Sequence, residues 1–221
     1  MSSSRTMIWP IVHAERARLV DDLSGLPTDA WATASLCPGW DVHDVLAHLV
    51  DSATTTRIGF VRRMISARFD FDADNELGIR RHRHADPAGT LDAMRAVVTA
   101  TSTPPAAPAT RLVEAFVHGE DIRRPLGITG GYPPAPVVEA LRHQVATSVS
   151  MGGGKQRVRG MRLVVTETGE TIGDDAAGAE VRGRAIDLLL AVSGRAVSAD
   201  AFDGPGAARL CVEHCRRPPA A

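Results

Sequence analysis

Hydrophobic residues recur at helical spacing through the first part of the chain. From residue 42 onward, apolar side chains fall at positions i, i+3, i+4, i+7 and i+8, which predicts an amphipathic helix facing a core. Asp41 is suited to cap its first turn, and Asp44 adds negative charge there. The apolar stripe consists of Val42, Val45, Leu46, Leu49 and Val50, and the predicted helix continues through Arg57, Phe60, Val61 and Met64.

The same periodicity predicts four further helices. They cover residues 12–25, with Pro10 in the first turn and Gly25 as the stop, and residues 87–100, 112–127 and 135–150. The segment 66–86 is polar and predicts an irregular loop, and residues 101–110 form a proline-rich break.

The pattern changes near residue 152. Two segments, MRLVVTET and AEVRGRA, carry the β-branched residues typical of strands, and the turn-rich GETIGDD separates them. AIDLLLAVSGR then predicts a helix that ends near Gly194. We therefore expect an α+β protein with a helical bundle at residues 1–151 and a small α+β domain at residues 152–221.

Composition narrows the class of protein. The chain has 221 residues, 44% of them hydrophobic and 23% charged, with a formal net charge of −1. These values predict a globular cytoplasmic protein with no basic face for nucleic acid and no segment of the roughly 20 apolar residues that cross a membrane. The run GGGKQ lacks the spacing of a phosphate-binding loop. The sequence does not indicate the oligomeric state.

The cysteines do not indicate a disulfide framework. They are three in number, and Cys37 is expected to be a small structural side chain. Cys211 and Cys215 flank His214 near the end of the chain. A compact zinc site usually has four ligands with tighter cysteine spacing, so this spacing favours two reduced cysteines on a terminal helix.

One helix carries a pair of residues suited to chemistry. Glu114 and His118 stand four residues apart, so they share one face at the edge of the apolar stripe. This spacing fits either a local hydrogen bond or two ligands of a metal ion. His48 borders the stripe of another helix, and an antiparallel bundle can bring it to the same interior site. Two imidazoles and one carboxylate form a zinc-type shell with an open position.

The remaining histidines have weaker claims. His82 and His84 lie in the arginine-rich segment RRHRHADP, His43 is expected at the surface, and His13 and His143 have no partner in the sequence.

Three stretches together resemble the mycothiol-dependent maleylpyruvate isomerase family, whose N-terminal domain is a DinB-like four-helix bundle. They are LPTDAWATASLCPGWDVHDVLAHLV (26–50), VEAFVHGEDIRRPLG (113–127) and the looser RVRGMRLVVTETGETIGDDAAGAEVRGRAIDLLLAVSGR (157–195). The resemblance implies that His48, Glu114 and His118 hold a divalent metal, Zn²⁺ being expected. It also implies an active-site arginine in the C-terminal domain, and Arg195 matches that position. An arginine at the surface, where the end of a helix favours a cation, fits the sequence at residue 195 equally well.

The family resemblance further implies mycothiol as the thiol cosubstrate. A metal-bound thiol loses its proton at neutral pH and can add to a small electrophilic substrate. Reversal after bond rotation gives isomerisation, and displacement of a leaving group gives S-transfer; the residues do not choose between them. The alternative is a metal-binding or ligand-binding regulatory module without enzymatic activity.

Overall fold

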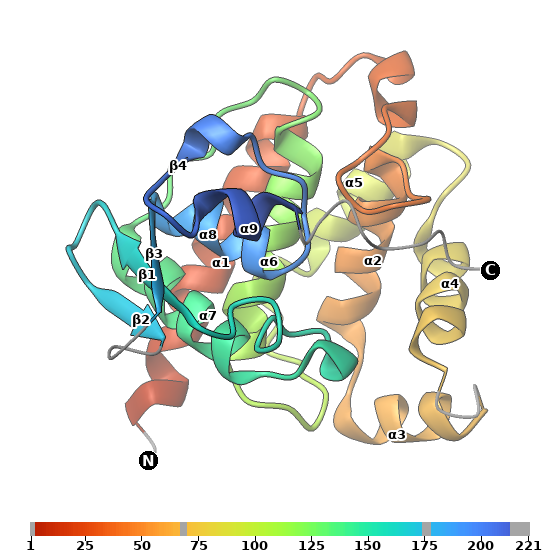
Figure 1. Ribbon diagram of the computed structural model, residues 1–221. Coiled ribbons are helices and arrows are strands. Elements are labelled where there is room, and N and C mark those ends of the chain that lie inside the picture. The colour runs from red at the N-terminus through yellow and green to blue at the C-terminus, as the bar shows by residue number, and fades with distance from the viewer. Residues whose placement is uncertain (1–2, 67–69, 174–177, 213–221) are drawn as a thin grey trace. The chain divides into compact units, whose positions relative to one another are not determined.

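A computed structural model describes residues 3–66, 70–173 and 178–212 of the chain (Figure 1). The chain forms two compact units that divide between Gly130 and Gly131. It is mostly helical, with one small four-stranded sheet, so the expected α+β class is confirmed. No described helix is long and apolar enough to cross a membrane.

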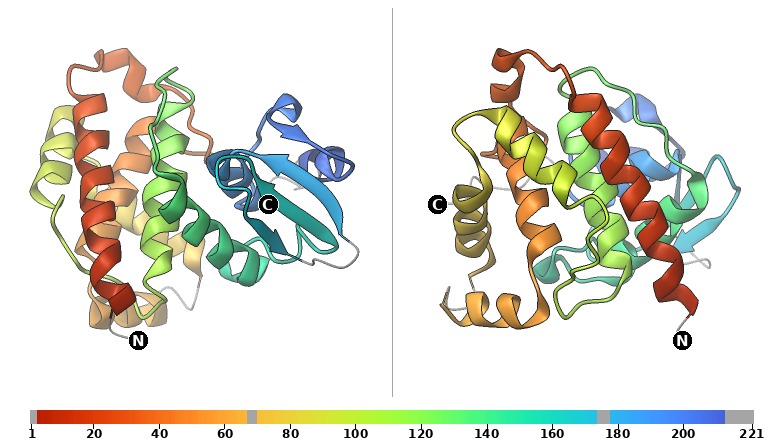
Figure 2. Two further views of the ribbon diagram at one scale, coloured as in Figure 1. Left: turned by 90° about the vertical axis from the view of Figure 1, so that its left-hand side faces the viewer. Right: turned by 180° about the vertical axis from the view of Figure 1, so that it is seen from behind.

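The first unit is a bundle built around α2. This helix contacts α4, α5 and α6, and α1 lies against α5 and α6 (Figure 2). Leu23, Leu46, Met94 and Ile122 are fully buried in its apolar core. The helices are α1 (Ser3–Leu23), α2 (Val42–Thr54), α3 (Arg57–Ser66), α4 (Phe71–His82), α5 (Pro87–Ala96) and α6 (Ala109–Arg123), with a 3₁₀ turn at Thr28–Ala32.

The predicted start of α2 is confirmed. The Asp41 carboxylate accepts a hydrogen bond from the Asp44 backbone N–H at 2.7 Å, and the Asp44 carboxylate accepts one from the Asp41 N–H at 3.1 Å. This reciprocal capping box satisfies two N–H groups that the helix cannot pair internally. It fixes where the helix carrying His48 begins.

The predicted end of that helix is wrong, because α2 stops at Thr54 and α3 starts at Arg57. The hydroxyls of Thr54 and Thr55 donate to the carbonyl of Asp51, and Thr55 has an extended backbone. Threonine side chains that bond to nearby carbonyls compete with helical pairing, which accounts for the break.

Within the segment 66–86, where a loop was expected, Phe71–His82 form the helix α4. Asp70 caps α4 by accepting from the N–H groups of Asp72 and Ala73. The guanidinium of Arg63 bonds to the buried carboxylates of Asp51 and Asp74, which ties α4 to its neighbours. Charge pairing rather than an apolar stripe holds this helix in place.

Two further expectations about the N-terminal helices are corrected. Pro10 lies inside α1 rather than in its first turn, because the helix begins earlier than predicted. His43 is 3% exposed rather than at the surface, and its Nε2 lies 2.7 Å from the Thr90 hydroxyl.

The second unit is a sheet with the strand order β2-β1-β3-β4. β1 pairs with β2 and β3 with β4 antiparallel, whereas β1 and β3 are parallel. The segment expected to be a turn contains β2. The elements are α7 (Pro134–Ala146), β1 (Met161–Val165), β2 (Thr171–Gly173), β3 (Ala179–Gly183), α8 (Ala185–Val192), β4 (Phe202–Asp203) and α9 (Ala207–Val212), with 3₁₀ turns at Val149–Met151 and Ala199–Ala201.

The division between the units falls earlier than residue 152. Helix α7 packs against α8, so it belongs with the sheet and not with the bundle. Cys211 lies in α9, while His214 and Cys215 are outside the described residues.

Candidate metal centre

The packing of α2 on α6 brings two histidines together. The rings of His48 and His118 lie with their centroids 4.9 Å apart and their planes 72° from parallel. Both come from the apolar edge of their helices, as the sequence predicted. Two imidazoles in such an arrangement can offer nitrogen atoms to one ion.

Glu114 approaches the same region from one turn earlier in α6. Its Oε2 lies 2.8 Å from Arg111 Nη1, and it accepts a short hydrogen bond from the Ser52 hydroxyl. Burial would raise the pKa of this carboxyl. The pKa is nevertheless held below its usual range by the charges of Arg111, His48 and His118 and by the hydrogen bond from Ser52. The carboxylate is therefore ionised and is electrostatically coupled to both histidines.

The three predicted ligands do not reach coordination spacing with one another. Among the described residues, the group whose potential ligand atoms all lie within 4.8 Å is Cys37, His118 and Asp121. His118 thus belongs both to this group and to the predicted set with His48 and Glu114. In this structure Glu114 is turned toward its arginine and serine partners.

The second carboxylate on α6 orients His118. Asp121 is fully buried, and its Oδ2 lies 2.9 Å from His118 Nδ1. Burial alone would lower the pKa of His118, but the hydrogen bonds to Asp121 and to the Cys37 side chain outweigh it and raise the pKa to about 9. A carboxylate bonded to one imidazole nitrogen leaves the other nitrogen to face a metal. Carboxylates are common partners of metal-binding histidines.

The CPGW loop (residues 37–40) is held against both helices. The Leu36 N–H donates to the Asp121 carbonyl at 3.2 Å, and the Trp40 ring lies 5.2 Å from the His48 ring between centroids. Gly39 adopts a φ of +84°, which an L side chain rarely takes. Trp40 therefore contacts the histidine that α2 carries.

The chemical types of these donors suit a divalent metal, although their spacing in this structure does not reach coordination distance. Two imidazoles and an ionised carboxylate come from adjacent helices, and Asp121 is bonded to Nδ1 of one imidazole. These are the ligand types and the supporting contact that catalytic zinc sites use. The competing histidine His43 is committed to Thr90, and burial lowers its pKa to about 4.

Sequence reasoning missed several residues around this centre. Asp121 follows His118 by three positions and Arg111 precedes Glu114 by three, so helical spacing alone could have indicated both. Ser52 follows His48 by four positions on α2. Cys37 was expected to be purely structural, yet it contacts His118. Arg16 of α1 acts on Glu114 from a segment far away in the sequence, so no spacing pattern could have indicated it.

The predicted active-site arginine belongs to the other compact unit. Arg195 follows α8, and its Nη1 donates to the Ser193 carbonyl at 3.1 Å. The structure therefore groups His48, Glu114 and His118 in the first unit and Arg195 in the second.

Part of the first unit is similar to a known domain family. Residues 12–103 match the model of the mycothiol maleylpyruvate isomerase N-terminal domain. The matched residues lie within the first compact unit, Met1–Gly130. The matched segment includes Cys37, Trp40 and His48, while α6 lies beyond it.

Solved structures extend the likeness over most of the chain. Crystal structures of the mycothiol-dependent maleylpyruvate isomerase and of a histidine-to-alanine mutant of it each align with a TM-score of 0.62 and 16% identity, over 92% of this chain and 93% of theirs. At this identity the likeness shows a shared fold. No curated protein matches the sequence.

Proposed function

We propose that this protein is a metal-dependent enzyme that uses mycothiol to isomerise, or transfer sulfur to, a small electrophilic substrate. The observation that carries the proposal is the His48–His118 ring pair beside the buried, ionised Glu114, inside a domain of this family. His48, Glu114 and His118 would hold the metal, for which Zn²⁺ is the expected ion.

The metal, when bound, would supply the acidity that converts the cosubstrate thiol into a thiolate at neutral pH. The protein's own groups prepare this site. Asp121 accepts from His118 Nδ1 and fixes its ring, Trp40 contacts the ring of His48, and Arg111 and Ser52 hold the Glu114 carboxylate. Arg195 would bind a carboxylate of the substrate by charge-assisted hydrogen bonds.

The test combines metal analysis with a thiol requirement. The purified full-length protein should contain one divalent ion per chain and should turn over electrophilic substrates only when mycothiol is present. His118→Ala should lose the ion while keeping the helical fold, because each ligand of a three-ligand site supplies a large share of the binding energy. The exposed His84 provides the control, since His84→Ala should keep metal and activity.

A metal-binding module without activity is the second candidate. The close grouping of Cys37, His118 and Asp121 favours it, because those three residues together could enclose an ion. Loss of metal in Cys37→Ser, with no turnover in the wild type, would support this alternative. Retention of both metal and activity in His118→Ala would contradict both candidates.

A further inference from the structure

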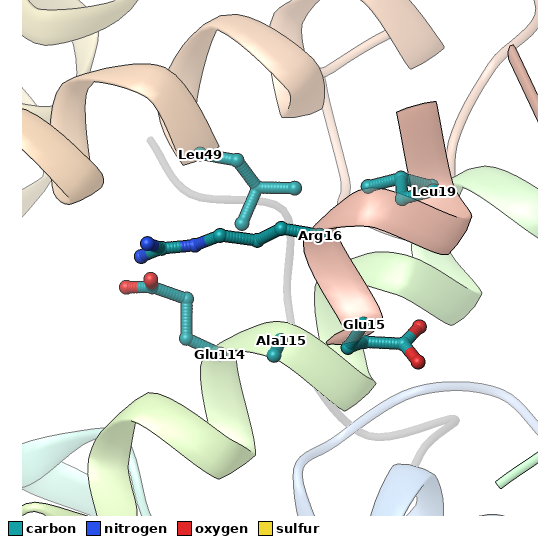
Figure 3. A pocket seen from close by; sticks show the side chains of 6 residues that line it. All are labelled: Glu15, Arg16, Leu19, Leu49, Glu114 and Ala115. Atoms are coloured by element: carbon teal, nitrogen blue, oxygen red, sulfur yellow. The ribbon is translucent and has the colours of Figure 1, made fainter. Parts of the chain in front are cut away.

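Two buried arginines meet at Glu114 from different helices. Arg16 on α1 is 4% exposed and Arg111 on α6 is 6% exposed. Arg111 Nη1 contacts both the Glu114 carboxylate and, at 2.7 Å, the Ser52 hydroxyl. The Arg16 guanidinium faces the Glu114 carboxylate (Figure 3), and its Nη1 donates to the carbonyl of Ala100 at 2.9 Å.

Each of these guanidinium groups has a buried N–H without an acceptor. Arg16 Nη2 and Arg111 Nε are shielded from solvent and have no hydrogen-bond partner among the described residues. A guanidinium presents five N–H donors, and leaving a buried donor unpaired is costly. Two such donors in one cluster indicate a place for an acceptor that the protein does not itself provide.

The charge at this site is also unbalanced. Arg16 and Arg111 share a single described carboxylate, that of Glu114. Burial and the charge of Arg111 lower the pKa of Arg16, and Glu114 opposes the shift without cancelling it. Glu15, the other carboxylate nearby, points away in Figure 3 and pairs with Arg123 and Arg18. An additional anion would complete the cluster.

A small cavity adjoins these groups. It is lined by Arg16, Glu114, Leu19, Leu49, Ala115 and Glu15 and has a volume of about 10 Å³, close to the minimum that holds one water. Arg16 and Glu114, whose side chains face each other in Figure 3, both line it. If Glu114 turned toward His48 and His118 to hold a metal, the two arginines would lose their counter-ion and the space would pass to another carboxylate.

We propose that Arg16 and Arg111 form a carboxylate-binding site beside Glu114, and that they help to determine specificity by holding a carboxylate of the substrate. The identity of the ligand as substrate rests on the proposed function; the anion site itself rests on the two guanidinium groups, their unpaired donors and the cavity. The bidentate geometry of guanidinium suits a carboxylate better than a neutral amide of the same shape.

The experiment compares acetate with acetamide as probes of the full-length protein. Binding is measured by isothermal titration calorimetry on protein dialysed with and without Zn²⁺. We expect acetate to bind more tightly than acetamide by at least tenfold, and more tightly with Zn²⁺ than without it. In Arg16→Gln and Arg111→Gln the acetate affinity should fall at least tenfold, whereas in the exposed control Arg80→Gln it should not change.

Folding of each variant is checked by circular dichroism and thermal melting. If Arg16→Gln does not fold, Arg16→Lys replaces it; this variant keeps the charge but loses the fork of donors, so intermediate acetate affinity is expected. Equal binding of acetate and acetamide, or wild-type acetate affinity in the folded arginine variants, would overturn the site. Arginine-dependent acetate binding without any mycothiol-dependent turnover would uphold the anion site and refute the proposed function instead.

Discussion

The two compact units bury different kinds of side chain. In the second unit, α8 and the strands fill the interior with Leu188, Leu189, Val165 and Val181, and few polar residues are buried. In the first unit, charged side chains lie inside the bundle alongside its apolar stripes. They are Glu15, Arg16, Asp51, Asp74, Arg111, Glu120, Asp121 and Arg123.

This difference separates an interior that is almost wholly apolar from one that holds many charged groups. Buried ion pairs are often no more stabilising than apolar residues of the same shape, because desolvation offsets the Coulomb attraction. A bundle that needed only stability would not require them. Three of them, Arg16, Arg111 and Asp121, act on Glu114 or His118, so we infer that these three set the charge of the candidate site at some cost in stability.

The largest expected effect tests this cost directly. Arg123 is 1% exposed and pairs with Glu15 and with Asp22 at 2.7 Å. Arg123→Met should lower the free energy of unfolding by about 3 kcal/mol, because it leaves the buried Glu15 carboxylate with only the half-exposed Arg18 as its partner. Urea denaturation measures the change.

The matched control lies in the second unit. Arg142 forms a half-exposed pair with Glu170 at 2.6 Å. Arg142→Met should change the unfolding free energy by less than about 1 kcal/mol, as exposed pairs do. Similar losses in the two variants would remove the contrast between the units.

The second prediction compares an arginine of the C-terminal unit with the proposed metal ligands of the bundle. We expect Arg195→Ala to keep its metal but to lose about 2–4 kcal/mol of transition-state stabilisation for a carboxylate substrate. Measuring kcat/KM and metal content together separates this role from that of His118. The control is Arg184→Ala, since Arg184 is exposed at the start of α8. Unchanged kinetics in Arg195→Ala would mean that this residue only ends its helix.

The third prediction concerns the buried His43. Burial lowers its pKa from 6.5 in the unfolded chain to about 4 in the folded protein. Between these values the unfolded state binds more protons than the native state, so stability is full above pH 6.5 and falls as the pH drops toward 4. We expect a loss of about 3 kcal/mol from this residue between pH 7 and pH 4.

The variant His43→Gln removes this titration and keeps a side chain that can bond to Thr90. Its unfolding free energy should therefore depend less steeply on pH than that of the wild type over the same range. Denaturation curves collected at several pH values give the comparison. Parallel pH profiles for the two proteins would show that His43 does not carry the effect.

Much of the fold could be predicted from the sequence, because local patterns decided it. The apolar stripe and the Asp41 cap located the start of α2, and β-branched runs located β1 and β3. The failures lie where long-range contacts act. Helix α4 depends on the ion pairs of Arg63 with Asp51 and Asp74, which no periodicity reveals.

In the candidate site, too, the sequence indicates some of the residues and the three-dimensional structure is needed for the others. The spacing of Glu114 and His118 is visible in the sequence, and their proximity to His48 follows from bundle packing. The contacts of Cys37 with His118 and of Arg16 with Glu114 join segments far apart in the chain, so only the three-dimensional structure shows them. Such partners decide whether a histidine pair is a metal centre or a surface contact.

The smallest expected effect contrasts how the two units begin their helices. In the bundle, the Asp41 side chain caps α2, whereas no side chain caps α8 at Arg184. Asp41→Ala should cost about 1 kcal/mol of unfolding free energy through loss of the cap, and Arg184→Ala should cost almost nothing. Because Asp41 also pairs with Arg83 at 2.8 Å, Asp41→Asn is needed to separate the two roles. Asparagine keeps the capping acceptor and removes the charge, so Asp41→Asn should retain most of the stability that Asp41→Ala loses. If the asparagine and alanine variants are equally destabilised in urea, the ion pair rather than the cap positions α2 and the histidine it carries.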